Sequence, residues 1–175
     1  MDWYETVFEL IDMRSFSNLW YWIALAVLWS TASHWVIGVP YDMVQRARRE
    51  GQGGAEDLAD IVRINVNRID YISKVSGIWI LGFGSAIMTA LCILGFVYWV
   101  EFAQAVFLLF FPMSIVGLLT LWTVSKIRDG ALTEEALYAA LTRHRLITQL
   151  IGIVSIFVTA VFGMYQNLNV GALGG

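Results

Sequence analysis

Two histidines, His34 and His144, are the residues of this 175-residue chain best suited to hold a cofactor. Paired imidazoles at similar depth in a helical bundle can ligate a b-type haem, so the two are candidate haem ligands. The alternative is structural. His34 would hydrogen-bond Ser30 one helical turn away, and His144 would join Arg143 and Arg145 in contacting lipid phosphates. Because membrane haem ligands usually lie deeper in the spans, we expect no bound cofactor.

The usual signatures of catalysis are absent from the sequence. It has no glycine-rich dinucleotide or phosphate loop, no HExxH zinc motif and no CxxC pair. Neither histidine has an acid nearby in sequence with which to activate a nucleophile. The single cysteine, Cys92, can form neither an intrachain disulfide nor a cysteine metal cluster. We therefore predict a protein that is not an enzyme and that holds no metal.

The composition is that of a membrane protein. The chain is 58% hydrophobic and 14% charged, whereas soluble domains are about 45–50% apolar and about 25% charged. Residues 75–125 contain one charged residue, Glu101, and as one helix would be about 77 Å long against a hydrocarbon core of about 30 Å. The run must fold back at Glu101, beside the interfacial aromatics Tyr98 and Trp99. Glu101 could relay protons, but its place at a turn favours a solvated residue.

Four apolar segments predict an all-α, polytopic membrane protein of one domain. The expected transmembrane helices cover 16–39, 76–100, 102–124 and 147–166. Pro40 should end the first span and Pro112 should kink the third. An amphipathic helix over 2–13 would lie in the membrane interface or dock a partner. The polar tail 167–175 is expected to be loose.

Basic residues predict the orientation. Ten of the eleven lie in two loops, 41–74 and 125–146. The positive-inside rule places both loops in the cytoplasm and both termini in the periplasm of a bacterial inner membrane. Helical cytoplasmic extensions are expected in these loops: a basic helix over 41–50, a flexible break at 51–54, a helix over 55–73 that continues into the second span, and a helix capped by Thr133 that leads into the fourth.

Ion pairs at helical spacing should support the helix over 55–73. Asp60 with Arg63, and Asp70 with Lys74, would lie on its polar side. No basic surface of the kind that binds nucleic acid stands out. The lipid bilayer and other membrane proteins are therefore the expected partners.

Residues suited to packing or partner contact gather in two spans. Ser30, Thr31 and His34 form a polar face of the first span, with Ser33 beside it, that should point at other helices rather than at lipid. Small residues in the second span should let helix backbones approach closely: Gly77, Gly82, Gly84 and Ala86. The arginines that could bind anionic headgroups, or serve only as topology determinants, are Arg46, Arg48, Arg49, Arg143 and Arg145.

Several stretches resemble a family of small, uncharacterised bacterial four-span inner-membrane proteins, some of them labelled as a component of the SufBCD iron–sulfur assembly complex. The stretches are 13–20, 33–35, 40–44, 63–68 (Arg-Ile-Asn-Val-Asn-Arg) and 163–168 (Gly-Met-Tyr-Gln-Asn-Leu). None of them is a catalytic motif. One cysteine and two histidines do not make a cluster-ligating set. The resemblance therefore implies a membrane docking partner and not a scaffold for the cluster.

The function expected from the sequence is that of a non-enzymatic membrane accessory or scaffold subunit. It would pack against other membrane proteins or self-assemble into a homo-oligomer. A small oligomeric channel or transporter is the alternative, because a polar face of hydroxyls and a kinked span can line a pore. A b-type haem electron carrier is a further alternative, and a Soret band would reveal it.

Overall fold

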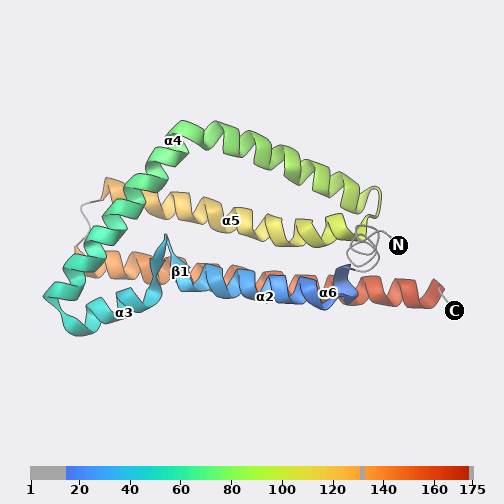
Figure 1. Cartoon of the computed structure of the whole chain (residues 1–175), viewed down its shortest axis with the longest axis horizontal. Helices are drawn as coiled ribbons and strands as arrows, with labels where there is room; N and C mark the ends of the chain where they lie inside the picture. The colour runs from blue at the N-terminus through green and yellow to red at the C-terminus, as the bar shows by residue number, and fades with distance from the viewer. Residues whose placement is uncertain (1–14, 131–132, 174–175) are drawn as a thin grey trace, which may run out of the picture.

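The computed structural model describes residues 15–130 and 133–173, and this part of the chain is almost wholly helical. In Figure 1, α5 and α6 run side by side along the long axis, α2 lies along α6, and α4 rises away from α5 and returns to it as an arch. The elements in chain order are η1 (Ser15–Ser17), α2 (Leu19–His34), β1 (Trp35–Val36), β2 (Val39–Pro40), α3 (Tyr41–Glu50), α4 (Gln52–Phe96), α5 (Glu101–Asp129) and α6 (Glu134–Leu173). The amphipathic helix predicted over 2–13 lies outside the described residues.

Three helices are long and apolar enough to cross a membrane: Gly53–Phe96, Glu101–Asp129 and Glu134–Leu168. They contain the predicted third and fourth spans and most of the second, whose helix ends at Phe96 and not at Val100. An all-helical structure with apolar helices long enough to cross a membrane is therefore confirmed. The predicted first span is different. Its helix, α2, has 16 residues and is about 24 Å long, shorter than a hydrocarbon core of about 30 Å.

A β-hairpin ends α2 earlier than the sequence suggested, so the prediction of a helix over 16–39 is wrong beyond His34. Strands β1 and β2 pair antiparallel, with Val36 opposite Val39. The two turn residues both have positive φ, 54° at Ile37 and 73° at Gly38, which is the signature of a type I′ turn. Positive φ is unusual for a β-branched residue. Ile37 is 3% exposed, so the core into which it packs holds it there.

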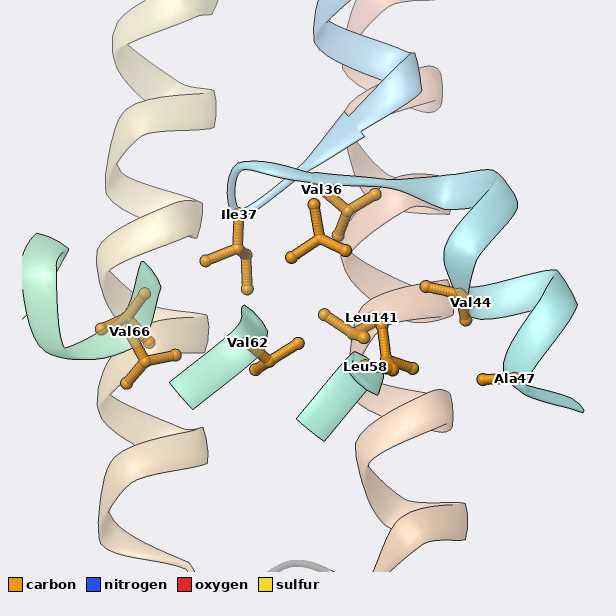
Figure 2. Close-up of a cluster of buried hydrophobic side chains, with 10 residues drawn as sticks. Val36, Ile37, Val44, Ala47, Leu58, Val62, Val66 and Leu141 are labelled. Carbon is orange, nitrogen blue, oxygen red and sulfur yellow. The ribbon is translucent and has the colours of Figure 1, made fainter. Parts of the chain in front are cut away.

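This hairpin is the centre of a hydrophobic core at the basic end of the molecule, which we call the cap. Figure 2 shows side chains from the hairpin, α3, the first half of α4 and the start of α6 pointing toward one another. Leu58, Val62 and Leu141 are almost fully buried there. The ten buried residues are Val36, Ile37, Val39, Val44, Ala47, Leu58, Val62, Val66, Val124 and Leu141. Both basic loops are therefore folded against each other at one end of the bundle.

The other predicted boundaries hold with two corrections. Helix α3 has the predicted bounds, and α4 runs without interruption from the cap into the second span. The break at 51–54 shrinks to Gly51, which has a φ of 74°. The tail is helical through Leu173, so the prediction of a loose tail is wrong for 167–173. Asn167, at the start of this segment, accepts a hydrogen bond from the Ser17 hydroxyl at 2.6 Å.

Two helix details predicted from residue type can be compared with the structure. The backbone N–H of Ala136 lies 3.4 Å from the Thr133 hydroxyl, which confirms Thr133 as the N-cap of α6. Helix α5 continues through Pro112 as one helix. The pronounced bend of the molecule lies near the middle of α4 instead (Figure 1).

We predict that Gly38→Ala destabilises the protein. The backbone at Gly38 has a φ of +73°, and holding an L-residue at positive φ costs roughly 1–2 kcal/mol. The added Cβ would also lie 3.3 Å from Cγ of Asn65. The measurement is thermal unfolding in detergent followed by circular dichroism. Gly53→Ala is the matched control, because nothing lies within 4 Å of its Cβ and alanine favours a helix. Equal midpoints for the two variants would contradict the role of the turn.

Candidate functional site

Helix α2 and the short helix η1 before it are fastened to α6 by two aromatic rings, one from each, that rest on glycines. A Cβ added to Gly152 would lie 2.8 Å from the Trp29 ring, and one added to Gly163 would lie 3.3 Å from Phe16. Because the order of these contacts is reversed between the two helices, α2 runs antiparallel to α6. Close approach at glycine is the packing mode that membrane helices favour.

The interior of the α2–α5–α6 bundle contains a line of polar side chains on α6. They are spaced by four, seven and four residues and so share one face. His144, Thr148, Ser155 and Thr159 are all buried. Small side chains at such an interface let helices approach closely. This spacing along α6 is the signal that sequence reasoning missed.

At the opposite end from the cap, polar groups join α5 to its neighbours. Glu101 accepts a hydrogen bond from the backbone N–H of Phe16 at 2.8 Å. Gln104 is fully buried, donates to the Gly95 carbonyl at 2.7 Å, and accepts a hydrogen bond from Gln166. Glu101 therefore begins α5 at the predicted turn, but it is half-buried and ties the start of the chain to α5.

The structure does not bring the two histidines into one site. His34 is exposed beside the ring of Trp35, whereas His144 is buried with Nδ1 at 3.1 Å from the Thr123 hydroxyl of α5. Neither histidine lines either of the two cavities described below. Within the described residues, no group of three His, Cys, Asp or Glu side chains could hold a metal ion.

The polar face of the first span is open in the part of the chain that the structure describes. Ser30, Thr31 and His34 are exposed, and Ser33 is half-buried and donates to the Ser30 carbonyl at 3.1 Å. The contact of this face with another helix stays a prediction.

Two of the five predicted headgroup arginines make contacts inside the cap. Arg48 lies over the Tyr138 ring at 5.4 Å and donates to the Thr142 hydroxyl at 3.1 Å. Arg145 lies over the Tyr41 ring at 3.9 Å. These contacts join α3 to α6. The others are exposed: Arg46, whose guanidinium lies 3.9 Å from Asp57, Arg49 and Arg143.

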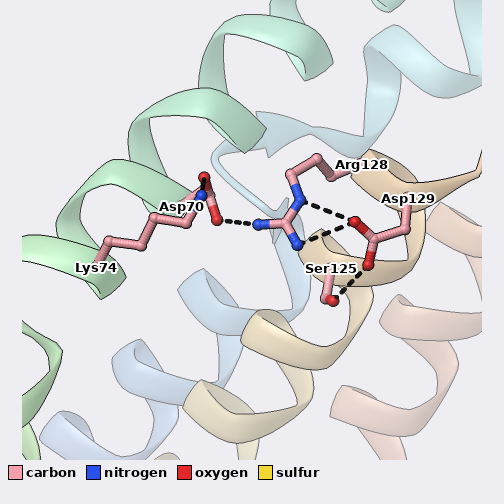
Figure 3. A network of polar contacts seen from close by, with 5 residues as sticks. All are labelled: Asp70, Lys74, Ser125, Arg128 and Asp129. Atoms are coloured by element: carbon pink, nitrogen blue, oxygen red, sulfur yellow. Dashed lines mark hydrogen bonds and ion pairs between the residues drawn. The ribbon is translucent and has the colours of Figure 1, made fainter.

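An ion-pair network fastens α4 to α5 at the cap (Figure 3). Arg128 donates to Asp70 on α4 and, at 2.9 Å, to its neighbour Asp129. Lys74 lies 2.7 Å from Asp70, and Ser125 donates to Asp129 at 3.1 Å. The Lys74–Asp70 pair and the Asp60–Arg63 pair, at 3.0 Å, were both predicted from spacing, whereas the bridge to Arg128 was not.

The network lies beyond the apolar part of the helices. Asp70 precedes the end of α4 by 26 residues, about 39 Å along the helix, which exceeds a hydrocarbon core of about 30 Å. The hydrogen bond from Lys74, followed by the charge of Arg128, lowers the pKa of Asp70 below its ordinary value. The hydrogen bond from Arg128 also lowers the pKa of Asp129. Both carboxylates are therefore ionised at neutral pH.

Helix α4 touches α5 a second time at its far end. A Cβ added to Gly95 would lie 3.1 Å from the Gln104 side chain and backbone. Between this contact and the Asp70–Arg128 bridge, α4 bows away and leaves a groove with a volume of about 740 Å³. A smaller cavity of about 300 Å³ lies in the cap, with Arg63 and Asn67 in its wall.

Because of this arch, the small residues of the second span do not pack within the chain. The most apolar stretch of α4 contains no buried residue. Nothing lies within 4 Å of a Cβ added to Gly82 or Gly84, and Gly77 meets only the Ser73 hydroxyl at 3.9 Å. These residues therefore make no close helix contact among the residues that the structure describes, and their packing against a partner helix stays a prediction. Gly77 and Gly84 line the groove, whereas Gly82 and Ala86 do not.

We predict that Asp70→Asn loosens the attachment of α4 and removes part of the pH dependence of stability. Because folding lowers the pKa of Asp70, its contribution is full above the unfolded pKa of about 3.9 and is lost as pH falls through the folded value. Thermal midpoints measured from about pH 7 to about pH 3 should fall in the wild type and fall less in the variant.

The matched control for this measurement is Asp60→Asn. Asp60 pairs with Arg63 on the same face of one helix and does not join two helices. Its loss should leave the pH dependence close to that of the wild type. Equal effects of the two substitutions would contradict a special role for the bridge between α4 and α5.

Comparison with protein-family models, with curated proteins and with solved structures found no match to this chain. The resemblance to the membrane family labelled with SufBCD stays a prediction.

Proposed function

We propose that this protein is a non-enzymatic accessory or scaffold subunit of a bacterial inner membrane, which packs against other membrane proteins or against further copies of itself. The observation that carries the proposal is that the most apolar stretch of α4 contains no buried residue. The face of this span that points away from α5 is therefore available to another helix.

The outer face of α4 has the residues that such a contact uses. Gly82, Ala86 and Ala90 recur every fourth residue, so they form one stripe. All three are exposed, and the side chains of Trp79 and Phe83 flank them at 68% and 64% exposure. Small residues at this spacing allow two helix backbones to approach closely, and the flanking rings supply contact area.

The proposed topology has four spans, with α2 as the first. Although α2 is short, η1 and α2 together lie along α6 from Phe16 to Trp29, beside residues 152–163 of the fourth span. The β-hairpin that follows α2 turns aside into the cap. With the basic loops in the cytoplasm, both termini are periplasmic. The exposed Ser30–His34 face then offers a second surface to a partner near the cytoplasmic side.

The test is to purify the protein in mild detergent and measure the mass of its complex. We expect a stoichiometric companion or a homo-oligomer for the wild type. The double variant Gly82→Leu and Ala86→Leu should run alone, because two leucines would keep the helix backbones apart. Gly117→Leu on α5 is the matched control, since nothing lies within 4 Å of its Cβ.

Two results would overturn the proposal. One is a wild-type protein that runs as a monomer with no companion at native abundance. The other is a double variant whose complex has the same mass and the same yield as the wild type. Circular dichroism of each variant checks that the helices have formed.

A further inference from the structure

We propose that the groove between α4 and α5 binds one acyl chain of an anionic membrane phospholipid, whose phosphate lies at the Lys74 end. The groove is closed at one end by the Asp70–Arg128 bridge and at the other by the contact of Gly95 with Gln104. Its wall runs along α4 from Ile69 to Thr89, about 30 Å of helix, whereas one acyl chain spans one leaflet, about half of the hydrocarbon core of about 30 Å. The groove is therefore long enough for one chain that enters from the Lys74 end and reaches Gly84.

The volume of the groove decides between a lipid chain and a helix. A transmembrane helix with its side chains is at least about 10 Å across and about 30 Å long, which is a cylinder of more than about 2,000 Å³. The groove holds about 740 Å³. That volume falls in the range of about 300–1,000 Å³ typical of small-ligand sites. A long, thin, apolar chain therefore fits, whereas a partner helix does not.

The wall of the groove consists mainly of apolar side chains from α4 and α5. Ile80, Leu81 and Met88 of α4 face Ile115 and Leu118 of α5 across it. The two hydroxyls of the wall that make hydrogen bonds use them within their own helices. Thr89 donates to the Ser85 carbonyl at 2.8 Å and Ser114 donates to the Phe110 carbonyl at 2.9 Å. A polar ligand would leave its own groups unpaired there, so a hydrocarbon chain is favoured.

The charged end of the groove carries an excess of cations. On α4, Lys74 lies one turn before Gly77 on the face that lines the groove, and its side chain is 66% exposed. On α5, Lys126 is exposed and lies 5.4 Å from the Trp122 ring. Lys74 and Arg128 pair with the carboxylates Asp70 and Asp129, and the nearby Lys126 brings the sum of these five groups to one positive charge. Basic pockets between helix ends on the cytoplasmic side suit anionic headgroups.

The inference goes beyond the proposed function, because it concerns the opposite face of α4. The groove face contains Gly77, Leu81 and Gly84, whereas the proposed docking stripe contains Gly82 and Ala86. A substitution on one face leaves the other intact. Failure of lipid binding and failure of partner docking can therefore be observed separately.

The experiment is native mass spectrometry of the full chain in mild detergent, with added phosphatidylglycerol or phosphatidylcholine. The wild type should retain one phosphatidylglycerol in preference to phosphatidylcholine. Gly84→Phe fills the groove with a ring and should lower retention of both lipids about tenfold. Gly82→Phe is the matched control, because it places the same ring on the outer face and should retain lipid as the wild type does.

The headgroup site is tested by Lys74→Gln. Its removal should reduce the preference for phosphatidylglycerol about fivefold, the effect of one cation near a charged lipid, while leaving phosphatidylcholine unchanged. Equal retention by the Gly84→Phe and Gly82→Phe variants would overturn the groove as the site. Equal retention of the two lipids by the wild type would overturn the assignment of an anionic headgroup.

Discussion

Two contacts separated by the length of a membrane span determine the shape of this molecule. The Asp70–Arg128 bridge attaches α4 to α5 at the cap, and the close approach of Gly95 to Gln104 attaches it at the opposite end. Because α4 bends between these points, it stands away from α5 over the stretch that separates them (Figure 1). The groove on one face of the arch and the unpaired stripe on the other both follow from this geometry.

The cap holds the first half of α4 in place, so the second half can separate from α5 while the helix stays attached to the bundle. Leu58, Val62 and Val66, in the first half of α4, are buried among the hairpin, α3, α5 and α6. Burial of each such side chain stabilises the folded state by roughly 1.5–3 kcal/mol. In lipid, by contrast, helix association gains little from hydrophobicity. The attachment of α4 therefore depends on the cap, and its membrane half is left for other contacts.

Much of the fold could be predicted from sequence because its causes are local. The bounds of α3, the N-cap at Thr133 and the turn at Glu101 follow from residues close together in the chain. The end of α2 could not be predicted, because the residues from Trp35 to Val39 are as apolar as those of the preceding helix. The hairpin depends instead on the packing of Ile37 in a core that is built from segments distant in sequence. The separation of α4 from α5 could not be predicted from the sequence either. Glycines at helical spacing indicate close approach, but they do not indicate whether the neighbour belongs to the same chain.

The composition of the cap has a consequence for the order of events during synthesis. Val36 of the hairpin packs in the same core as Leu141, which follows it by 105 residues. At about 5–20 residues per second, the ribosome needs roughly 5–20 s to make the intervening chain. Throughout that interval the hairpin and α3 lack their final neighbour, so apolar side chains of the cap stay exposed. This segment is therefore most prone to misfolding or aggregation in the period before α6 is made.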